Sequence, residues 1–265
     1  MYDSNEIPTV SAILYYYDDC IDDRESLATK FISMIQQSIF YNFTKIVIRK
    51  NIIVNGMCKS KTLRYSSKDI REIDLECSLN EWIWDKDTTS ISLVNVSRNN
   101  PDSYFSIDWF VGYALPSGEK NRIFETLNIS CTYDKIANQS THDGFVQLFC
   151  NMASLLNAFY GNIDDVAVSV DTMDKTKEKC FTDKYLQTVY WGNFFGKKIC
   201  EDIGMQVLTS LPVERKLTIG DGFYFSVTTN IQDSEHSNMR LRKQIYKLLK
   251  PSKSNTLTNY NRYSK

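Results

Sequence analysis

The sequence predicts an α+β protein, mainly an antiparallel sheet packed with two long helices, in an arrangement that allows two related halves. Two observations favour this fold class. Stretches rich in β-branched and aromatic residues are separated by turn formers, which is typical of antiparallel strand pairs. Two stretches with helical periodicity lie far apart in the chain, so a regular βαβ repeat is not expected. No residue-level repeat supports the two halves.

The first hundred residues contain expected strands around one long helix. Residues 10–17 and 45–54 read as strands from their β-branched and aromatic content, and residues 91–97 as a further strand. Asp22, with Glu25 three residues later, gives a start similar to a capping box and predicts a helix through about Asn42. Its apolar residues recur at helical spacing: Leu27, Phe31, Met34, Ile35 and Ile39. The pair Asn55-Gly56 indicates a hairpin.

A long hairpin and a second long helix are expected in the middle of the chain. Residues 104–115 and 122–133 are strand-like, and the segment Pro116–Asn121 between them is rich in turn formers. From Asp143 the sequence predicts a helix, which Gly161 is expected to cap. Its apolar residues keep one face: Phe145, Leu148, Phe149, Met152, Leu155, Leu156 and Phe159. Residues 166–170 are expected to return to the sheet as a strand.

The stretch Tyr190–Gly196, Tyr-Trp-Gly-Asn-Phe-Phe-Gly, concentrates aromatic rings between glycines. It predicts a tight connection whose rings dock beside the short amphipathic run of residues 197–203, with Gly192 and Gly196 supplying backbone freedom. Trp191 is then a core residue. The alternative is an exposed anchor for a partner, since Tyr and Trp dominate binding hot spots. Further on, residues 216–219 and 223–228 flank Gly220-Asp221-Gly222 as a hairpin, and residues 239–249 form a basic helix.

The same aromatic stretch carries a resemblance to a known family. Together with Ile199, Ile203-Gly204, the segment from Leu208 to Pro212 and the Gly220-Asp221-Gly222 turn, it resembles bacterial immunity proteins of the immunity protein 52 type. The resemblance covers roughly the last third of the chain. It implies a cytoplasmic antidote that binds and silences one secreted toxin, often a nuclease delivered by type VI secretion. It implies no particular residue that contacts the toxin.

Composition and charge describe an acidic body with a basic tail. The chain has 265 residues, 42% hydrophobic and 24% charged, and a formal charge of −1. Residues 239–265 hold 8 Lys or Arg and no acid, which leaves 23 bases against 32 acids, a net charge of −9, in residues 1–238. The expected organisation is therefore a body of residues 1–238, with two subdomains of about 1–100 and 101–238 as an option. Residues 239–265 form a basic helix with a disordered tail.

The expected location is the cytoplasm. The chain opens with Asp3 and Glu6 instead of a basic, apolar leader, and no apolar stretch reaches the roughly 20 residues that a membrane span needs. Seven cysteines lie singly along the sequence without a C-x-x-C pair, which favours reduced thiols over disulfides or a zinc site.

No catalytic constellation stands out, so an enzyme, a cofactor and a metal are not expected. The two histidines, His142 and His236, belong to no nucleophile elbow or metal-spaced pair. Asp164, Asp165, Asp171 and Asp174 surround a strand-like run and are interpreted as solvated acids. Catalytic groups that only folding brings together would escape this search, so an enzyme with dispersed catalytic residues is a further alternative.

Two acidic and aromatic segments are the candidate partner-binding sites. The first comprises Tyr15, Tyr17, Asp18, Asp19 and Asp22. The second places Trp82 and Trp84 among the acids Glu72, Asp74, Glu76, Glu81, Asp85 and Asp87. Acids at the first segment could instead only end a strand and start a helix, where the helix dipole favours carboxylates. As interfaces, the carboxylates would speed encounter with a basic partner and the rings would hold the contact.

The leading hypothesis is a non-catalytic immunity protein that masks the active site or substrate path of a cognate toxin, with Trp191 as a further candidate contact. A nuclease toxin must be basic where phosphates bind, so an acidic antidote suits it. The alternative is a nucleic-acid-binding regulator that acts through the basic C-terminal helix. More often such a helix packs its apolar side on the body and leaves its bases in water.

Overall fold

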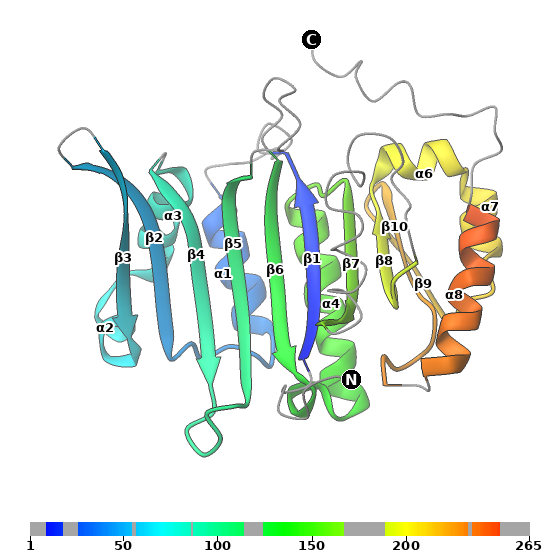
Figure 1. Ribbon diagram of the computed structural model, residues 1–265, viewed down its shortest axis with the longest axis horizontal. Coiled ribbons are helices and arrows are strands. Elements are labelled where there is room, and N and C mark those ends of the chain that lie inside the picture. The colour runs from blue at the N-terminus through cyan, green and yellow to red at the C-terminus, as the bar shows by residue number, and fades with distance from the viewer. Residues whose placement is uncertain are drawn as a thin grey trace, which may run out of the picture.

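The computed structural model describes residues 9–17, 26–54, 57–85, 87–113, 124–166, 189–232 and 235–249. Within these ranges ten strands form one antiparallel sheet in the order β3-β2-β4-β5-β6-β1-β7-β8-β10-β9 (Figure 1). The strands are β1 (Thr9–Tyr16), β2 (Lys45–Val54), β3 (Met57–Ser66), β4 (Thr88–Val96), β5 (Tyr104–Tyr113), β6 (Phe124–Thr132), β7 (Tyr160–Asp165), β8 (Gly192–Phe195), β9 (Arg215–Ile219) and β10 (Gly222–Ser226). The helices are α1 (Leu27–Gln37), α2 (Ser67–Glu72), α3 (Leu75–Trp84), α4 (Gln139–Leu155), α6 (Lys197–Ile203), α7 (Met205–Ser210) and α8 (Glu235–Leu249).

The strand nearest the N-terminus lies in the middle of the sheet. β1 pairs with β6 from Thr9 opposite Thr132 to Tyr16 opposite Glu125, and it pairs with β7 on its other side. Its alternate residues Val10, Ala12, Leu14 and Tyr16 are fully buried. Such alternation is expected of a strand with one face turned toward covering helices. The strand predicted for residues 10–17 is confirmed.

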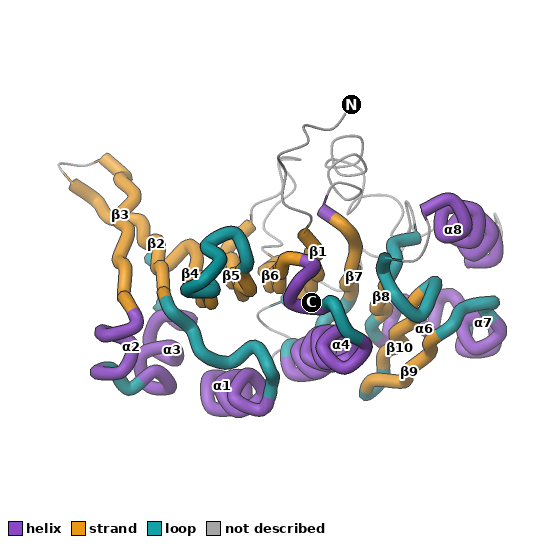
Figure 2. Tube along the Cα trace, turned by 90° about the horizontal axis from the view of Figure 1, so that it is seen from below, coloured by secondary structure: helices purple, strands orange, loops and turns teal. Residues whose placement is uncertain are grey.

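Helices cover different faces at the two ends of the sheet. α1, α3 and α4 lie along one face, whereas α8 lies on the other side, beyond β8 (Figure 2). The larger core contains side chains of β1 to β7 together with those of α1, α3 and α4, such as Phe31, Trp109 and Phe149. A smaller core joins Phe195 and the strand β10 to residues of α6, α7 and α8. The sheet therefore has two separate apolar cores.

The predicted fold class is wrong. The structure is mostly sheet with several short helices, not two long helices packed on a sheet, and its strands form one continuous sheet rather than two related halves. The helix expected from Asp22 to Asn42 is α1, which in the described residues runs only from Leu27 to Gln37 and ends where Ser38 becomes extended. The apolar spacing continued to Ile39, but that side chain is 59% exposed. The periodicity thus extended beyond the helix.

The aromatic stretch 190–196 is a strand where the sequence predicted a connection. β8 pairs with both β7 and β10, and all four of its residues are buried. A strand buried on both faces lacks the polar alternation by which strands are recognised. Gly196 has an ordinary φ of −71°, so it supplies space instead of backbone freedom. A Cβ there would lie 2.5 Å from the carbonyl oxygen of Ala158.

Three predicted hairpins are confirmed within the described residues: β2–β3, β5–β6 and β9–β10. The second long helix, α4, begins earlier than expected, with Asn138 capping it by accepting the backbone N–H of Thr141 at 3.0 Å. Gly161 does not cap that helix. It lies in β7, where an added Cβ would meet Leu14 at 2.7 Å, so close packing against β1 requires it.

Some predictions fall on residues that the structure does not describe. The strand expected at 166–170 lies outside the described residues except for Val166, and the tail from Pro251 onward lies outside them entirely. The basic helix expected at 239–249 is α8. The domain boundaries near residues 100 and 238 stay predictions, and strands from both sides of residue 100 belong to the same sheet.

Candidate protein-interaction surface

Two short helices at one end of the sheet carry the second acidic segment. α2 follows β3 directly, because Ser66 forms a capping box with Asp69, whose carboxylate accepts the Ser66 N–H and hydroxyl, each at 2.7 Å. α3 starts at Asp74, whose carboxylate accepts the Cys77 N–H at 3.1 Å. These bonds, the backbone N–H bond first in each case, hold the pKa of both carboxyls below its usual value. Asp69 and Asp74 therefore act first as helix caps.

The buried side of α3 fixes which way its acids point. Leu79, Trp82 and Ile83 are buried, and the Trp82 ring packs against Tyr65 of β3 with centroids 5.4 Å apart. Trp82 is thus a core residue that holds α3 on the sheet. Trp84 is half-buried, and its indole N–H donates to Asn80 at 3.0 Å. Trp84 is therefore the aromatic side chain of this segment that keeps accessible surface.

The last acids of the segment connect α3 to the sheet. The Asp85 carboxylate binds the Lys50 ammonium of β2 at 2.5 Å and accepts the backbone N–H of Asp87 at 3.0 Å. The bond from Lys50, followed by that from Asp87, lowers the pKa of Asp85. Both side chains of this pair remain about a quarter exposed, at 23% and 25%. Asp85 is therefore a structural residue at the rim of the surface.

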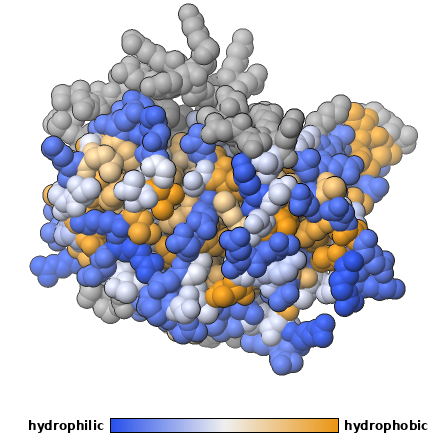
Figure 3. Space-filling model, turned by 180° about the vertical axis from the view of Figure 1, so that it is seen from behind, coloured by the Kyte–Doolittle hydropathy of each residue, from blue (hydrophilic) through white to orange (hydrophobic). Residues whose placement is uncertain are grey.

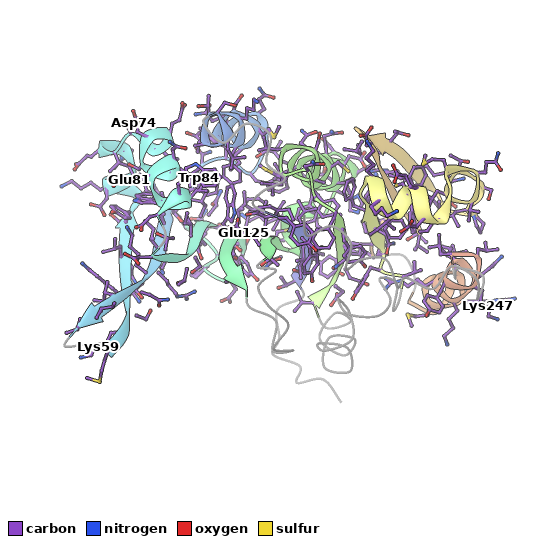
Figure 4. All side chains as sticks on the ribbon, turned by 90° about the horizontal axis from the view of Figure 1, so that it is seen from above. Lys59, Asp74, Glu81, Trp84, Glu125 and Lys247 are labelled. Atoms are coloured by element: carbon purple, nitrogen blue, oxygen red, sulfur yellow. The ribbon has the colours of Figure 1, made fainter. Side chains whose placement is uncertain are left out.

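The remaining carboxylates of this segment form few contacts that stabilise the fold. Glu72, Glu76, Glu81 and Asp87 are exposed, and within the described residues no ion pair involves them. Glu76 accepts the hydroxyl of Thr29 on α1 at 2.5 Å. We call these four acids with Trp84 the α2–α3 surface. Figure 4 shows Asp74, Glu81 and Trp84 together on this helix pair, on the side of the sheet away from Lys59.

The first acidic segment is only partly described. Asp18, Asp19 and Asp22 lie outside the described residues. Tyr15 and Tyr17 are half-buried at the end of β1, where Tyr17 stacks on Phe159 with centroids 4.8 Å apart. Between them Tyr16 is buried and donates its hydroxyl to Glu125, which explains why an acid interrupts the apolar face of β6.

Trp191 lies in the interior, far along the sheet from Trp82 and Trp84. Its ring is 1% exposed and meets the edge of His142 with centroids 5.0 Å apart. Its indole N–H donates to Thr228 at 2.9 Å. The structure therefore does not bring the predicted partner-binding residues into one site. In this conformation Trp191 has no surface to offer a partner.

The basic helix α8 is attached to the sheet by a buried ion pair. The guanidinium of Arg242 binds both oxygens of Asp164 on β7, at 2.5 and 3.0 Å. Burial raises the pKa of the Asp164 carboxyl, and the charge of Arg242 opposes that shift. Ile245 and Leu249 are also buried, whereas Arg240, Lys243 and Lys247 are exposed. The acids at 164–165 thus serve packing in the described structure.

The sequence interpretation predicted the hairpin β2–β3 but overlooked its positive charge. Residues 45–66 contain six bases and no acid: Lys45, Arg49, Lys50, Lys59, Lys61 and Arg64. Ile53 and Met57, near its turn, are 82% and 59% exposed. In the space-filling view from the helix side, an apolar patch marks this tip at the upper right (Figure 3). Counting charge segment by segment would have identified this hairpin as basic.

The described residues contain neither a cluster of metal-binding side chains nor a helix suited to cross a membrane. No group of three or more His, Cys, Asp or Glu within them is placed to hold a metal ion. None of the described helices combines the length and apolarity that a membrane crossing requires.

Comparison with known proteins shows a likeness in fold. No protein-family profile matches the sequence, and no curated protein matches it. Among solved structures, the chain is similar to the Pseudomonas aeruginosa T6SS protein PA0821, with a TM-score of 0.57 and 16% sequence identity. The match covers 93% of this chain and 75% of that one. At this identity the likeness is one of fold.

Proposed function

We propose that this chain is an immunity protein associated with a type VI secretion system, which binds a cognate toxin and masks its active site or substrate path. The observation that carries the proposal is the α2–α3 surface, where four exposed carboxylates outside any ion pair of the described residues lie on the same helix pair and its end as the partly buried Trp84. The fold shared with a T6SS protein of Pseudomonas aeruginosa supports the secretion-system association.

Electrostatics explains why such a surface suits a nuclease toxin. A protein that cleaves nucleic acid presents basic side chains where the phosphates bind. Residues 67–87 contain 7 acids and 3 bases, a net charge of −4. Complementary charges steer the encounter, and a desolvated aromatic ring at the centre of the contact resists dissociation. Glu72 and Glu81 would then govern association, and Trp84 the lifetime of the complex.

The direct test is rescue and complex formation with the toxin encoded beside this chain. Cells that produce both proteins should survive, and the purified pair should elute together on size exclusion. Death of the cells that produce both proteins, together with separate elution of the two purified proteins, would refute the proposal. The matched variants are Glu72→Lys/Glu81→Lys and, as a control with the same charge change at the other end of the sheet, Glu201→Lys/Glu214→Lys, whose acids are exposed.

The variants separate the α2–α3 surface from overall charge. The first double variant should lower the association rate constant about tenfold at low salt, and the control should change it little. Trp84→Ala should raise the dissociation rate about 30-fold if the ring is a hot spot. Equal association rates for both double variants would remove the α2–α3 surface from the interface while leaving toxin binding itself intact.

Nucleic-acid binding through α8 is the second candidate, because Arg240, Lys243 and Lys247 are exposed on one basic helix. Retardation of a DNA or RNA fragment at physiological salt, lost in Arg240→Gln/Lys243→Gln/Lys247→Gln, would favour it. The immunity proposal expects no retardation.

A further inference from the structure

The hairpin β2–β3 extends past the strand that supports it. β4 pairs with β2 only between Lys45 and Lys50, whereas β2 and β3 continue to pair with each other up to Val54 and Met57. Toward the tip, the outermost hydrogen bond between the hairpin and the rest of the described chain runs from the Asn51 N–H to the Asp87 carbonyl, at 2.7 Å. Figure 2 shows the hairpin projecting away from α2 and α3, on the other side of the sheet. Its outer part is therefore a two-stranded arm.

The hairpin carries positive charge on both faces, with Lys59 in the arm itself and Arg49 and Lys61 at its base. Of the six bases of the hairpin, Lys50 is paired with Asp85. The other five are exposed, and within the described residues no ion pair involves them. Cross-strand register puts Arg49 and Arg64 on one face of the ribbon, and Lys59 and Lys61 on the opposite face. A partner that neutralises Arg49 together with Lys59 and Lys61 has to contact both faces of the ribbon.

The apolar tip is also two-sided. Ile53 lies opposite Cys58, and Met57 lies opposite Val54, so the two exposed side chains point to opposite faces. Exposed apolar side chains gathered at a projecting tip mark interaction sites. Protection of an edge strand from aggregation explains lysines on β3. It does not explain Arg49 on the inner strand or the bare Ile53 and Met57.

We propose that the hairpin β2–β3 is a plug that enters a carboxylate-lined cleft of the cognate toxin; this rests on the proposed function. A cleft contacts both faces of a ribbon, and carboxylates complement its bases. The α2–α3 surface lies on the other side of the sheet from the arm, so a toxin that takes up the plug and also contacts that surface is acidic in its cleft and basic beyond it. This is the charge pattern of a metal-dependent nuclease, in which carboxylates bind divalent ions and basic side chains bind phosphates.

Two other anionic partners fit less well. A bilayer would receive the turn residues Asn55 and Gly56 first, and hydrocarbon offers their polar groups no hydrogen bonds. The tip also has no Trp or Tyr, which are the residues favoured at membrane interfaces. Nucleic acid would be repelled by residues 67–87, which follow the hairpin directly and carry a net charge of −4. A protein cleft can supply both the polar and the apolar contacts.

The test measures binding of the full chain to the toxin encoded beside it. Lys59→Glu/Lys61→Glu should raise Kd about 100-fold and abolish inhibition, and Ile53→Ser/Met57→Ser should raise Kd about 30-fold. The control Lys243→Glu/Lys247→Glu makes the same charge change on α8 and should stay within about threefold of the wild-type Kd. Unchanged circular dichroism and melting temperature should show that the exposed arm variants fold.

Divalent ions supply a readout specific to the plug. If the lysines occupy the metal-binding carboxylates, magnesium should weaken binding of the wild-type chain, and this dependence should vanish in Lys59→Glu/Lys61→Glu. Wild-type affinity in both arm variants, or a Kd independent of magnesium, would overturn the plug while leaving the immunity function standing. Binding of the arm to a DNA duplex or to phosphatidylglycerol vesicles in place of the toxin would also overturn it. Absence of any wild-type complex with the toxin would overturn both proposals.

Discussion

Each of the two ends of the sheet has an ion pair between a strand and a helix, and the two ion pairs differ in how deeply they are buried. At the β9 end, Arg242 of α8 binds Asp164 of β7, with side chains only 10% and 1% exposed. At the β3 end, Lys50 of β2 binds Asp85 after α3, with side chains 23% and 25% exposed. The first pair lies in a low dielectric and shares its site with buried apolar residues, whereas the second is solvated. Removing one partner should therefore destabilise the protein much more at the buried pair than at the solvated pair.

Tryptophan residues at the two ends of the sheet also differ in burial. Replacing the buried one should have the largest effect on the free energy of unfolding. Trp191→Ala should reduce the free energy of unfolding by about 3–5 kcal/mol, because it empties a buried site and removes the bond to Thr228. Trp84→Ala, at the other end, should cost less than about 2 kcal/mol because its ring is only partly buried. Urea denaturation measures both. Equal losses would contradict the difference in burial on which the comparison depends.

Removal of one partner from the buried pair should come next. Arg242→Ala should cost about 3 kcal/mol, since Asp164 stays buried without its counter-charge. Lys243→Ala, one residue along the same helix and exposed, is the control and should change the free energy of unfolding by less than about 0.5 kcal/mol. A double variant Asp164→Leu/Arg242→Met should recover part of the loss. Failure of the single variant to exceed its control would show that α8 is held by its apolar side alone.

The solvated pair should matter much less. Lys50→Ala should cost about 0.2–1 kcal/mol, and the difference from wild type should shrink as salt is added, because salt screens exposed charges. Denaturation at low and high ionic strength measures it. A loss as large as that of Arg242→Ala, or one indifferent to salt, would show that the β3 end is as tightly bound as the β9 end.

The smallest effect concerns acid. The folded-state pKa of Asp85 lies below its usual value of 3.8, first because of the Lys50 bond. Its contribution is thus fully present above the unfolded-state pKa of about 3.8 and is lost as the pH falls through the lower folded-state value. The stability difference between wild type and Lys50→Ala should therefore vanish in strong acid. A difference that persists there would assign the effect to packing of the lysine stem.

Sequence patterns located elements better than they located partners. Alternation and turn residues placed β1, β2 and the β9–β10 hairpin, because those signals are local. β8 was missed since a strand buried on both faces shows no alternation, and the short helices α2 and α3 went unassigned as elements although their charges were noted. The order of the strands in the sheet could not be predicted from the sequence, because it depends on pairings between residues that are distant along the chain. The pair Arg242–Asp164 joins residues 78 positions apart.

The candidate surface was visible in the sequence only as composition. The acids of residues 72–87 were identified, but their division into caps such as Asp74 and unpaired acids such as Glu81 required the fold. Trp191 and Trp84 looked alike as aromatic anchors, and only burial distinguishes them. The bases of β2–β3 were countable from the start, yet the overall acidity of residues 1–238 obscured them.

The central place of β1 has a consequence for biosynthesis. Tyr16 of β1 lies opposite Glu125 of β6, and Val10 lies opposite Asp165 of β7, 155 residues further along, so β1 waits after its synthesis for both of its neighbours. At roughly 5–20 residues per second, that wait lasts on the order of 8–30 s. During it, an apolar segment is exposed to chaperones and to other nascent chains. The folded protein would therefore lag behind translation of β1 by at least this interval.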